Sequence, residues 1–310
     1  MRALLTQLTA VERLAAHVTT LPAEFVRALG EDLEYARFGA VLPELPWFGG
    51  WTLGVEAWVA DGTPPPFAVL LSRRAPVAFG LKAAELVSNG ALVGSEAGLA
   101  FVAGWFTQVC VSRALEPLVA GLIEHRPRTS ERSTSARARI EWAQSLFLMQ
   151  ELHGSPLVGT PAVRAKLQIR KGNPLTGVGR GLYELMRVCS LEALGEAPLK
   201  PEVDGWMRGL SLFSLALGSP LGRLKALPAL QLRDPTVYRS PGVDVFAALD
   251  RGLDQTREVL RHVGGMIRRN SFSARARLRL QELLPEGPPE VSPAPPPLPA
   301  PAASPAPEAA

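Results

Sequence analysis

Three polar side chains recur at four-residue intervals within the most apolar segment of the chain. Gln108, Ser112 and Glu116 all lie in Ala97–Glu124, which is otherwise rich in Ala, Val, Leu and Phe. An α-helix places residues four apart on one face, so these side chains would form a single polar stripe. A helix this apolar is expected to be buried, and a buried polar stripe needs hydrogen-bonding or ionic partners. The groups that face the stripe therefore decide what chemistry the chain can perform.

Two other segments carry charged residues that could meet this stripe. The segment Ala136–Leu152 predicts a long helix, on which Arg137 and Glu141 share a face because they are four residues apart. Glu44 lies between two prolines in the aromatic-rich segment 36–51, which its prolines and glycines predict to be an ordered loop. Carboxylates in such a cluster can bind a divalent metal, transfer protons or pair with a guanidinium.

The elements that must position these residues are all predicted to be helical. No segment alternates apolar and polar residues as a half-buried strand would, and no internal repeat is found. A helix is expected to end at Gly264-Gly265. The expected helices span residues 4–20, 22–28, 31–39, 75–89, 97–124, 136–152, 161–170, 182–194, 201–217, 243–263 and 273–284.

The fold class predicted from this pattern is all-α, with one compact multi-helix domain over residues 1–284. Residues 285–310 consist almost entirely of Pro, Ala, Ser and Glu. Such a segment cannot bury enough apolar surface to offset the entropy lost on ordering, so a disordered tail is expected. The tail is interpreted as a solubilising segment, with a docking segment as the alternative.

The net charge, the cysteines and the apolar segments indicate which partners and which cell compartment to expect. The net charge of +4 over 310 residues gives no specific nucleic-acid signal, and the arginines of 268–279 are interpreted as a solvated helix face. Cys110 and Cys189 form no metal-binding motif, and Cys110 is expected to be buried. The start of the chain does not resemble a signal peptide, and the charge-free run 97–112 is short for a membrane span. A cytoplasmic protein without transmembrane helices is expected.

The segment FVAGWFTQVCVSRALEPLV resembles the signature helix of the zinc-dependent phospholipase C family, which is related to the zinc-dependent single-strand nucleases. In that family, this helix, a His-x3-Glu pair on the next long helix and a Gly-Ala-x-x-Pro-Asp-Leu loop supply zinc ligands. Here FGAVLPELPWF stands in the place of that loop, and the resemblance covers roughly residues 35–150. It implies an all-α fold of the phospholipase C and nuclease type, with zinc as cofactor and a phospholipid or other phosphoester as ligand.

Most of the implied metal ligands are replaced in this chain. Glu141 alone keeps the family's residue type, and His17 is a candidate for an N-terminal histidine ligand. If any metal binds, the resemblance implies His17, Glu44, Glu116 and Glu141 as its ligands. The positions implied to line the former metal pocket are Glu44 for Asp, Ser72 for His, Gln108 for His, Ser112 for Asp, Glu116 for His, Arg137 for His, and Glu141.

Zinc binds imidazole, thiolate and carboxylate, so Gln, Ser and Arg are poor substitutes. Arg137 is permanently cationic and would repel a neighbouring divalent metal. Two interpretations of Arg137 are open. It could replace the metals as the counter-ion of Glu44, Glu116 and Glu141, or it could form an ordinary surface pair with Glu141, in which case Arg139 would be the inward residue.

Three functions remain compatible with the sequence. The first is a non-catalytic binding or interaction module of the phospholipase C type with a degraded metal site, and it needs no cofactor. The second is an active metal-dependent phosphoester hydrolase that uses metal to activate water. The third is a helical adaptor unrelated to that family, with the proline-rich tail as its docking element.

Overall fold

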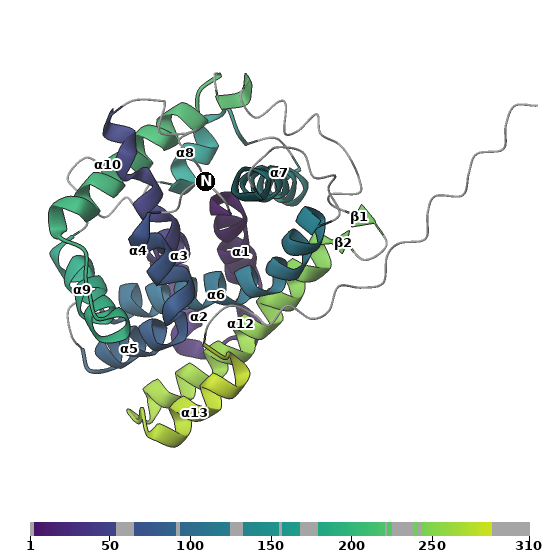
Figure 1. Cartoon of the computed structure of the whole chain (residues 1–310). Helices are drawn as coiled ribbons and strands as arrows, with labels where there is room; N and C mark the ends of the chain where they lie inside the picture. Colours follow the sequence, from purple (N-terminus) through teal and green to yellow (C-terminus); the bar gives the residue numbers. More distant parts are fainter. Residues whose placement is uncertain are drawn as a thin grey trace, which may run out of the picture.

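The computed structural model describes residues 3–53, 65–90, 94–124, 133–154, 157–167, 179–220, 222–224, 239–240, 243–244 and 245–286. Within these ranges the chain is almost wholly helical, which confirms the all-α fold class (Figure 1). Two strands of two residues each, β1 (Arg239–Ser240) and β2 (Val243–Asp244), pair antiparallel beside the first turn of a helix. The sequence pattern did not predict them, because two residues are too few to show alternation.

The helices lie close to their expected positions. Pro76 begins one of them, where its missing N–H costs nothing, and Gly195 ends another with a left-handed φ of 82°. The helical elements are α1 (Leu4–Ala16), η1 (Val18–Thr20), α2 (Ala23–Glu31), α3 (Leu33–Val41), η2 (Leu42–Leu53), α4 (Pro66–Val69), η4 (Leu70–Arg74), α5 (Pro76–Ser88), α6 (Ser95–Glu124), α7 (Ser133–His153), α8 (Pro161–Leu167), α9 (Arg180–Leu194), α10 (Lys200–Leu217), α12 (Val245–Arg268) and α13 (Ala274–Leu283).

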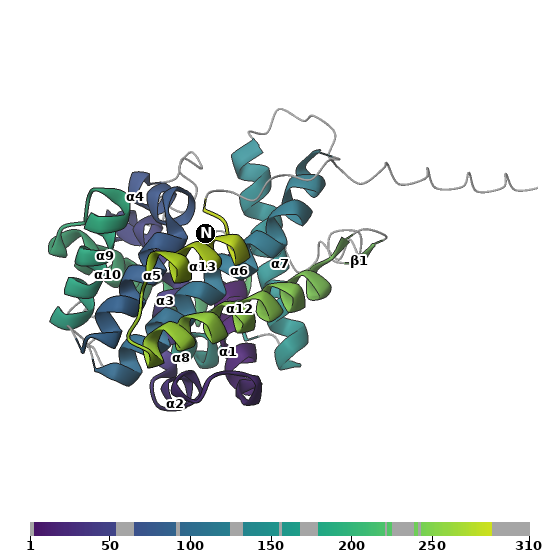
Figure 2. The same cartoon turned by 90° about the horizontal axis from the view of Figure 1, so that it is seen from below.

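Helix α6 is the centre around which the others pack. It contacts α1, α2, α3, α5, α7 and α12, and Figures 1 and 2 show it crossing the middle of the molecule. Every residue from Ala97 to Val111 is buried. By length and composition α6 could cross a membrane, but 83% of its most apolar stretch is buried within the fold. Burial of that extent is typical of a core helix, so α6 is weak support for a membrane span.

Helices α3 and α6 approach so closely that their backbones touch. A Cβ on Gly104 would lie 1.8 Å from the carbonyl oxygen of Ala36. A Cβ on Gly39 would lie 2.2 Å from the carbonyl oxygen of Phe101. Both positions therefore require glycine. This crossing fixes the position of α3 relative to α6. Because η2 follows α3 directly in the chain, the position of η2 is fixed as well.

Three expected element boundaries were wrong. The single helix expected over residues 4–20 ends at Ala16 and is followed by the separate 3-10 turn Val18–Thr20. The aromatic-rich segment around Glu44 is not a loop but a run of 3-10 helix, Leu42–Leu53, of the kind that often connects α-helices. Helix α12 does not end at Gly264-Gly265 but continues to Arg268. Gly264 serves packing there, because a Cβ would lie 2.5 Å from the Glu24 carboxylate.

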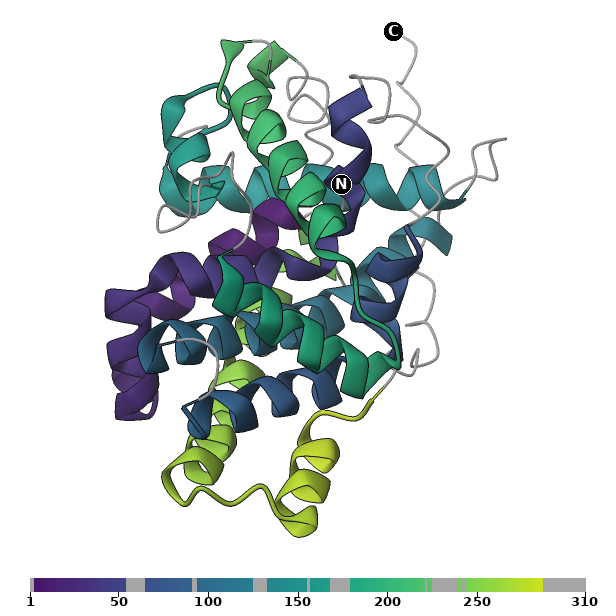
Figure 3. The same cartoon turned by 90° about the vertical axis from the view of Figure 1, so that its left-hand side faces the viewer.

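Helices α12 and α13 form an antiparallel hairpin at one edge of the molecule (Figures 1 and 3). Leu280 and Leu284 are fully buried and belong to the same hydrophobic core as Leu4 and the other buried residues of α1. Beyond α13, Pro285 and Glu286 also contact the fold, although the expected tail included them. The Glu286 carboxylate accepts hydrogen bonds from the first backbone N–H groups of α5, and residues 287–310 lie outside the described ranges.

Candidate functional site

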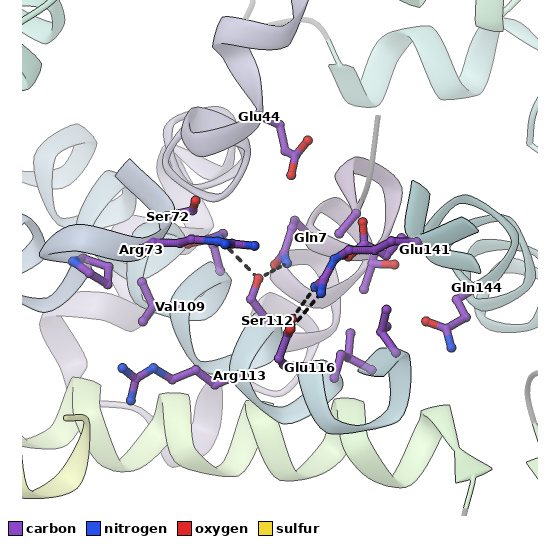
Figure 4. A pocket seen from close by; sticks show the side chains of 17 residues that line it. Gln7, Glu44, Ser72, Arg73, Val109, Ser112, Arg113, Glu116, Glu141 and Gln144 are labelled. Atoms are coloured by element: carbon purple, nitrogen blue, oxygen red, sulfur yellow. Dashed lines mark hydrogen bonds and ion pairs between the residues drawn. The ribbon is translucent and has the colours of Figure 1, made fainter. Parts of the chain in front are cut away.

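The polar stripe of α6 borders a cavity of about 250 Å³. The cavity lies between α1, η2, η4, α6 and α7, and Figure 4 shows these elements contributing side chains from several sides. The seven pocket positions implied by the family resemblance all line it: Glu44, Ser72, Gln108, Ser112, Glu116, Arg137 and Glu141. Segments separated by about a hundred residues thus meet at one place.

Arg137 holds the carboxylates of two helices together. Its two terminal nitrogens donate to the two oxygens of Glu116 on α6, and its Nε donates to Oε1 of Glu141 at 2.8 Å. The side chains of Arg137, Glu116 and Glu141 are 20%, 28% and 10% exposed, so water screens this cluster only partly. Hydrogen bonding to Glu116, opposed by burial, raises the pKa of Arg137 above its usual value. The guanidinium therefore stays charged and neutralises the negative charge of Glu116 and Glu141 at this side of the cavity.

Of the two orientations considered for α7, the structure has Arg137 at the cavity. Arg139 is exposed and does not line it. The Arg137–Glu141 contact is an i,i+4 pair, but Arg137 also reaches across to α6. The ion pair is therefore part of the contact between α6 and α7 and not only a local surface pair.

Ser112 is the hydrogen-bonding centre of the stripe. Its Oγ accepts from Nε2 of Gln7 at 3.0 Å and from Nε2 of Gln108 at 3.2 Å (Figure 4). A hydroxyl oxygen has two lone pairs, so both are used and the hydroxyl hydrogen is left to donate. Two amides from α1 and α6 thereby fix Ser112 as a donor at the cavity wall.

Two buried glutamines of the cavity lining have side-chain atoms without a hydrogen-bond partner. Gln7 and Gln144 are only 1% and 3% exposed, and both line it. Oε1 of Gln7 and Nε2 of Gln144 make no hydrogen bond within the part of the chain that the structure describes. A buried polar atom without a partner costs free energy, and because neither atom is accessible to water, a bound molecule could pair with them only if these side chains turned.

Two arginines at the cavity differ in their surroundings. Arg73 on η4 is exposed, and Figure 4 shows its side chain extending towards the middle of the cavity. Arg113 turns away from the cavity and donates to the backbone carbonyl of Pro285. Burial lowers the pKa of Arg113, and the nearby Glu286 carboxylate partly offsets this effect. Arg73 is therefore the arginine whose guanidinium a bound anion could reach.

The remaining expected residues have different places. Glu44 lines the cavity from η2, with its carboxylate directed inward (Figure 4). Ser72 lines it too, but its hydroxyl donates to the carbonyl of Ala68 at 2.7 Å. His17 lies at the far end of α1, is exposed, and contacts the carbonyl of Arg13. It does not line the cavity and is not near the other implied metal ligands.

Sequence reasoning missed Gln7, Arg73, Arg113 and Gln144. A usable signal existed for two of them. Gln7 occurs among Leu4, Leu8 and Val11 on the apolar side of its helix, and Gln144 follows Glu141 by three residues on the same face as Arg137. Arg73 and Arg113 carry no such signal, since arginine is common on surfaces.

The donor set at the cavity does not fit a zinc centre. No group of three or more His, Cys, Asp or Glu side chains that could hold a metal occurs in the described ranges. The two carboxylates of α6 and α7 are engaged by Arg137, whose fixed positive charge opposes a cation at the same place. The residues present suit the binding of a polar organic molecule better than the coordination of zinc.

No protein-family model, no curated protein and no solved structure matches this chain.

Proposed function

We propose that this chain is a non-catalytic binding module built on the plan of the zinc-dependent phospholipases C, in which a guanidinium takes the place of the metals. The observation that carries the proposal is the bridging of Glu116 and Glu141 by Arg137. Seven positions chosen from sequence alone by the family resemblance border one cavity, which supports kinship more than it supports an unrelated adaptor.

Two of the three carboxylates that line the cavity are poorly suited to catalysis because they are held in an ion pair. Hydrolysis of a phosphoester needs an activated water, which a metal or a general base supplies. A carboxylate held in an ion pair with a guanidinium is a weak base, because the pairing stabilises its ionised form. Glu116 and Glu141 are held in this way, so they are poorly suited to accept a proton from water.

The ligand that the cavity suits best is a small molecule with a phosphoester group. The guanidinium of Arg73 and the hydroxyl of Ser112 are donors from which phosphate oxygens accept hydrogen bonds. The carboxylate of Glu44, which is directed into the cavity, would accept from a hydroxyl or ammonium group of the same molecule. A volume of about 250 Å³ is compatible with a ligand of metabolite size.

Metal analysis and a phosphodiesterase assay test the absence of catalysis. Full-length protein is equilibrated with Zn²⁺, desalted and analysed by plasma mass spectrometry, and hydrolysis of p-nitrophenylphosphorylcholine is measured. We expect substoichiometric zinc and no turnover above buffer. Two or more zinc ions retained per chain, together with hydrolysis, would sink the proposal in favour of the active enzyme.

A variant that restores the implied family ligands tests kinship separately. Gln108→His, Ser112→Asp, Glu116→His and Arg137→His are combined in one chain. We expect this variant to retain zinc where the wild type does not, because the four positions border one cavity. A folded variant that still binds no zinc would count against the phospholipase C plan while leaving a binding role open.

Calorimetric titration with phosphocholine tests the ligand class. We expect saturable binding to the wild type and about tenfold weaker binding to Arg73→Gln, since one charge-assisted hydrogen bond is lost. Arg208→Gln, an exposed arginine on α10, is the matched control and should bind as the wild type does. Equal phosphocholine affinity of the two variants would show that Arg73 does not contribute to the binding site.

A further inference from the structure

The positive charge of the chain is concentrated in its last helical hairpin. Residues 257–282, which cover the second half of α12 and all of α13 except its last residue, contain seven arginines and two glutamates, a net charge of +5. The whole chain carries +4, so the residues outside 257–282 together carry only −1. Charge of one sign gathered on one element creates a local field that attracts anions.

Three of the seven arginines are held in ion pairs: Arg257 with Asp254, Arg268 with Glu24, and Arg277 with Glu85 of α5. Four other arginines of the hairpin are exposed and form no ion pair with any described residue: Arg261, Arg269, Arg275 and Arg279. Ion pairs within the fold therefore explain only some of the arginines in residues 257–282.

The outer face of α13 combines this charge with an exposed aliphatic side chain. Arg275, Leu278 and Arg279 are spaced three and four residues apart and share one face of the helix. Leu278 is 58% exposed, whereas Leu280 on the opposite face is fully buried. The hairpin lies at the edge of the molecule, where no other described element covers α13 from outside (Figures 1 and 3). A flat, anionic partner could therefore reach this face.

We propose that the outer face of the α12–α13 hairpin binds membranes that contain anionic lipids. Arginines adsorb to the negatively charged headgroups, and Leu278 enters the boundary between headgroups and acyl chains. Nucleic acid is the less suitable polyanion, because an aliphatic side chain in the centre of the face gains nothing from a phosphate backbone. No exposed aromatic residue stands beside these arginines on α13 to stack on bases either. This inference does not depend on the ligand of the cavity.

Vesicle co-sedimentation tests the proposal with the full-length protein. Vesicles of phosphatidylcholine alone are compared with vesicles that also contain phosphatidylserine. We expect binding only to the anionic vesicles, and loss of that binding in high salt, because salt screens exposed charges. Equal binding to both compositions, or no binding to either, would overturn the proposal.

Matched variants locate the surface. Arg275→Glu combined with Arg279→Glu should weaken vesicle binding by at least about 25-fold, as each arginine near an anionic surface contributes about fivefold. Arg164→Glu combined with Arg208→Glu changes the net charge equally, on α8 and α10, and should weaken binding far less. Equal losses in the two variants would show that net charge alone acts, and the α13 surface would be rejected.

A substitution of Leu278 distinguishes binding to a membrane from binding to another polyanion. Leu278→Ser should weaken binding to anionic vesicles by about threefold while the melting temperature stays unchanged, because an exposed side chain contributes little to folding. Leu199→Ser, at a leucine that is 66% exposed before α10, is the control and should have no effect. Tighter binding to a single-stranded or duplex 20-mer than to vesicles, with no effect of Leu278→Ser, would assign the face to nucleic acid and refute the proposal.

Discussion

The two halves of helix α6 are held in opposite ways. In the first half, the backbone of α6 touches that of α3 at Gly104 and Gly39, and the rings of Phe101 and Phe38 pack against each other between the same two helices. In the second half, Ser112 and Glu116 meet other helices through hydrogen bonds and an ion pair at the border of a cavity. Shape alone determines the first contact, and charge and hydrogen bonding determine the second.

This difference predicts a difference in tolerance. A backbone-to-backbone contact leaves no room for a methyl group, because protein interiors are close-packed and relax only partly. A contact made by long polar side chains beside a cavity can rearrange or admit water. Substitutions at the glycines of the first half should therefore lower the free energy of unfolding strongly or prevent folding. Substitutions of the polar residues in the second half should lower it by smaller, differing amounts.

The largest effect is expected at the crossing of α3 and α6. Gly104→Ala places a methyl group 1.8 Å from the carbonyl oxygen of Ala36, so the two helices must separate. We expect loss of about 3 kcal/mol or more of unfolding free energy, or no folded protein. Circular dichroism with urea titration measures it.

Gly121→Ala on the same helix is the control for this prediction. Nothing lies within 4 Å of a Cβ at Gly121, so alanine should stabilise the protein by about 0.5–1 kcal/mol through its higher helix propensity. Similar stability of the Gly104 and Gly121 variants would mean that the two helices are farther apart than the structure shows.

The next largest effect is expected where α6 meets α7. Arg137→Ala leaves the Glu116 and Glu141 carboxylates close together without their shared counter-ion. We expect a loss of about 2–4 kcal/mol in unfolding free energy, below the largest values for buried pairs because water screens this cluster partly. The same urea titration measures the loss.

Arg208→Ala on α10 is the matched control, since Arg208 is exposed and should lose less than about 0.5 kcal/mol. Restoration of stability by adding Glu116→Gln to Arg137→Ala would show that uncompensated charge is the cause. A variant with only Arg137→Ala that is as stable as the control would reduce the bridge to an ordinary surface pair.

A smaller effect is expected at Ser112, again in the second half of α6. Ser112→Ala removes the oxygen that accepts from Gln7 and Gln108. We expect a loss of about 1–2 kcal/mol, because the buried Gln7 amide is left without an acceptor. Ser72→Ala at the same cavity should cost less than about 0.5 kcal/mol, as its hydroxyl bonds only its own helical turn. Equal losses would contradict the central role of Ser112.

The fold could be predicted from sequence to the extent that it depends on periodicity and stop signals. The 3.6-residue pattern identifies α12, which buries one continuous face, whereas α6 is identified by its long apolar run because it is buried on all sides from Ala97 to Val111. The end of α12 was misplaced because Gly264 packs against Pro22 and Glu24, and no local pattern shows such a contact. Gly104 is likewise an ordinary helix glycine until the position of α3 is known.

The candidate site was predictable where a spacing rule or the family resemblance applied. Gln108, Ser112 and Glu116 follow from four-residue spacing, and their common cavity with Arg137 fits the family plan. Which of Arg137 and Arg139 faces inward could not be predicted, since two residues apart on a helix differ by about 200° and both sides are polar. The cavity role of Gln7 depends on how α1 lies against α6, which is a tertiary contact.

The smallest expected effect concerns how the segment after α13 is attached beside the second half of α6. The Glu286 carboxylate accepts from the N–H of Ala78 at 2.5 Å and of Val77 at 3.2 Å, close to Arg113. Burial raises the pKa of Glu286, and the two backbone hydrogen bonds and Arg113 offset this only partly. The folded state therefore binds this proton more tightly than the unfolded state, so stability is lost as the pH rises through the folded pKa.

Replacing the carboxylate with an amide removes this titration and isolates its contribution. The melting temperature of Glu286→Gln minus that of the wild type should increase by about 1–2 °C between pH 4 and pH 7. Glu282→Gln, at an exposed position on α13, removes one carboxylate in the same way and is the control. A difference that falls with pH would show instead that the helix N-terminus and Arg113 outweigh burial. Glu286 and Arg113 would then hold the segment after α13 against the polar half of α6 by charge, and the contrast between the two halves would be sharper than the structure indicates.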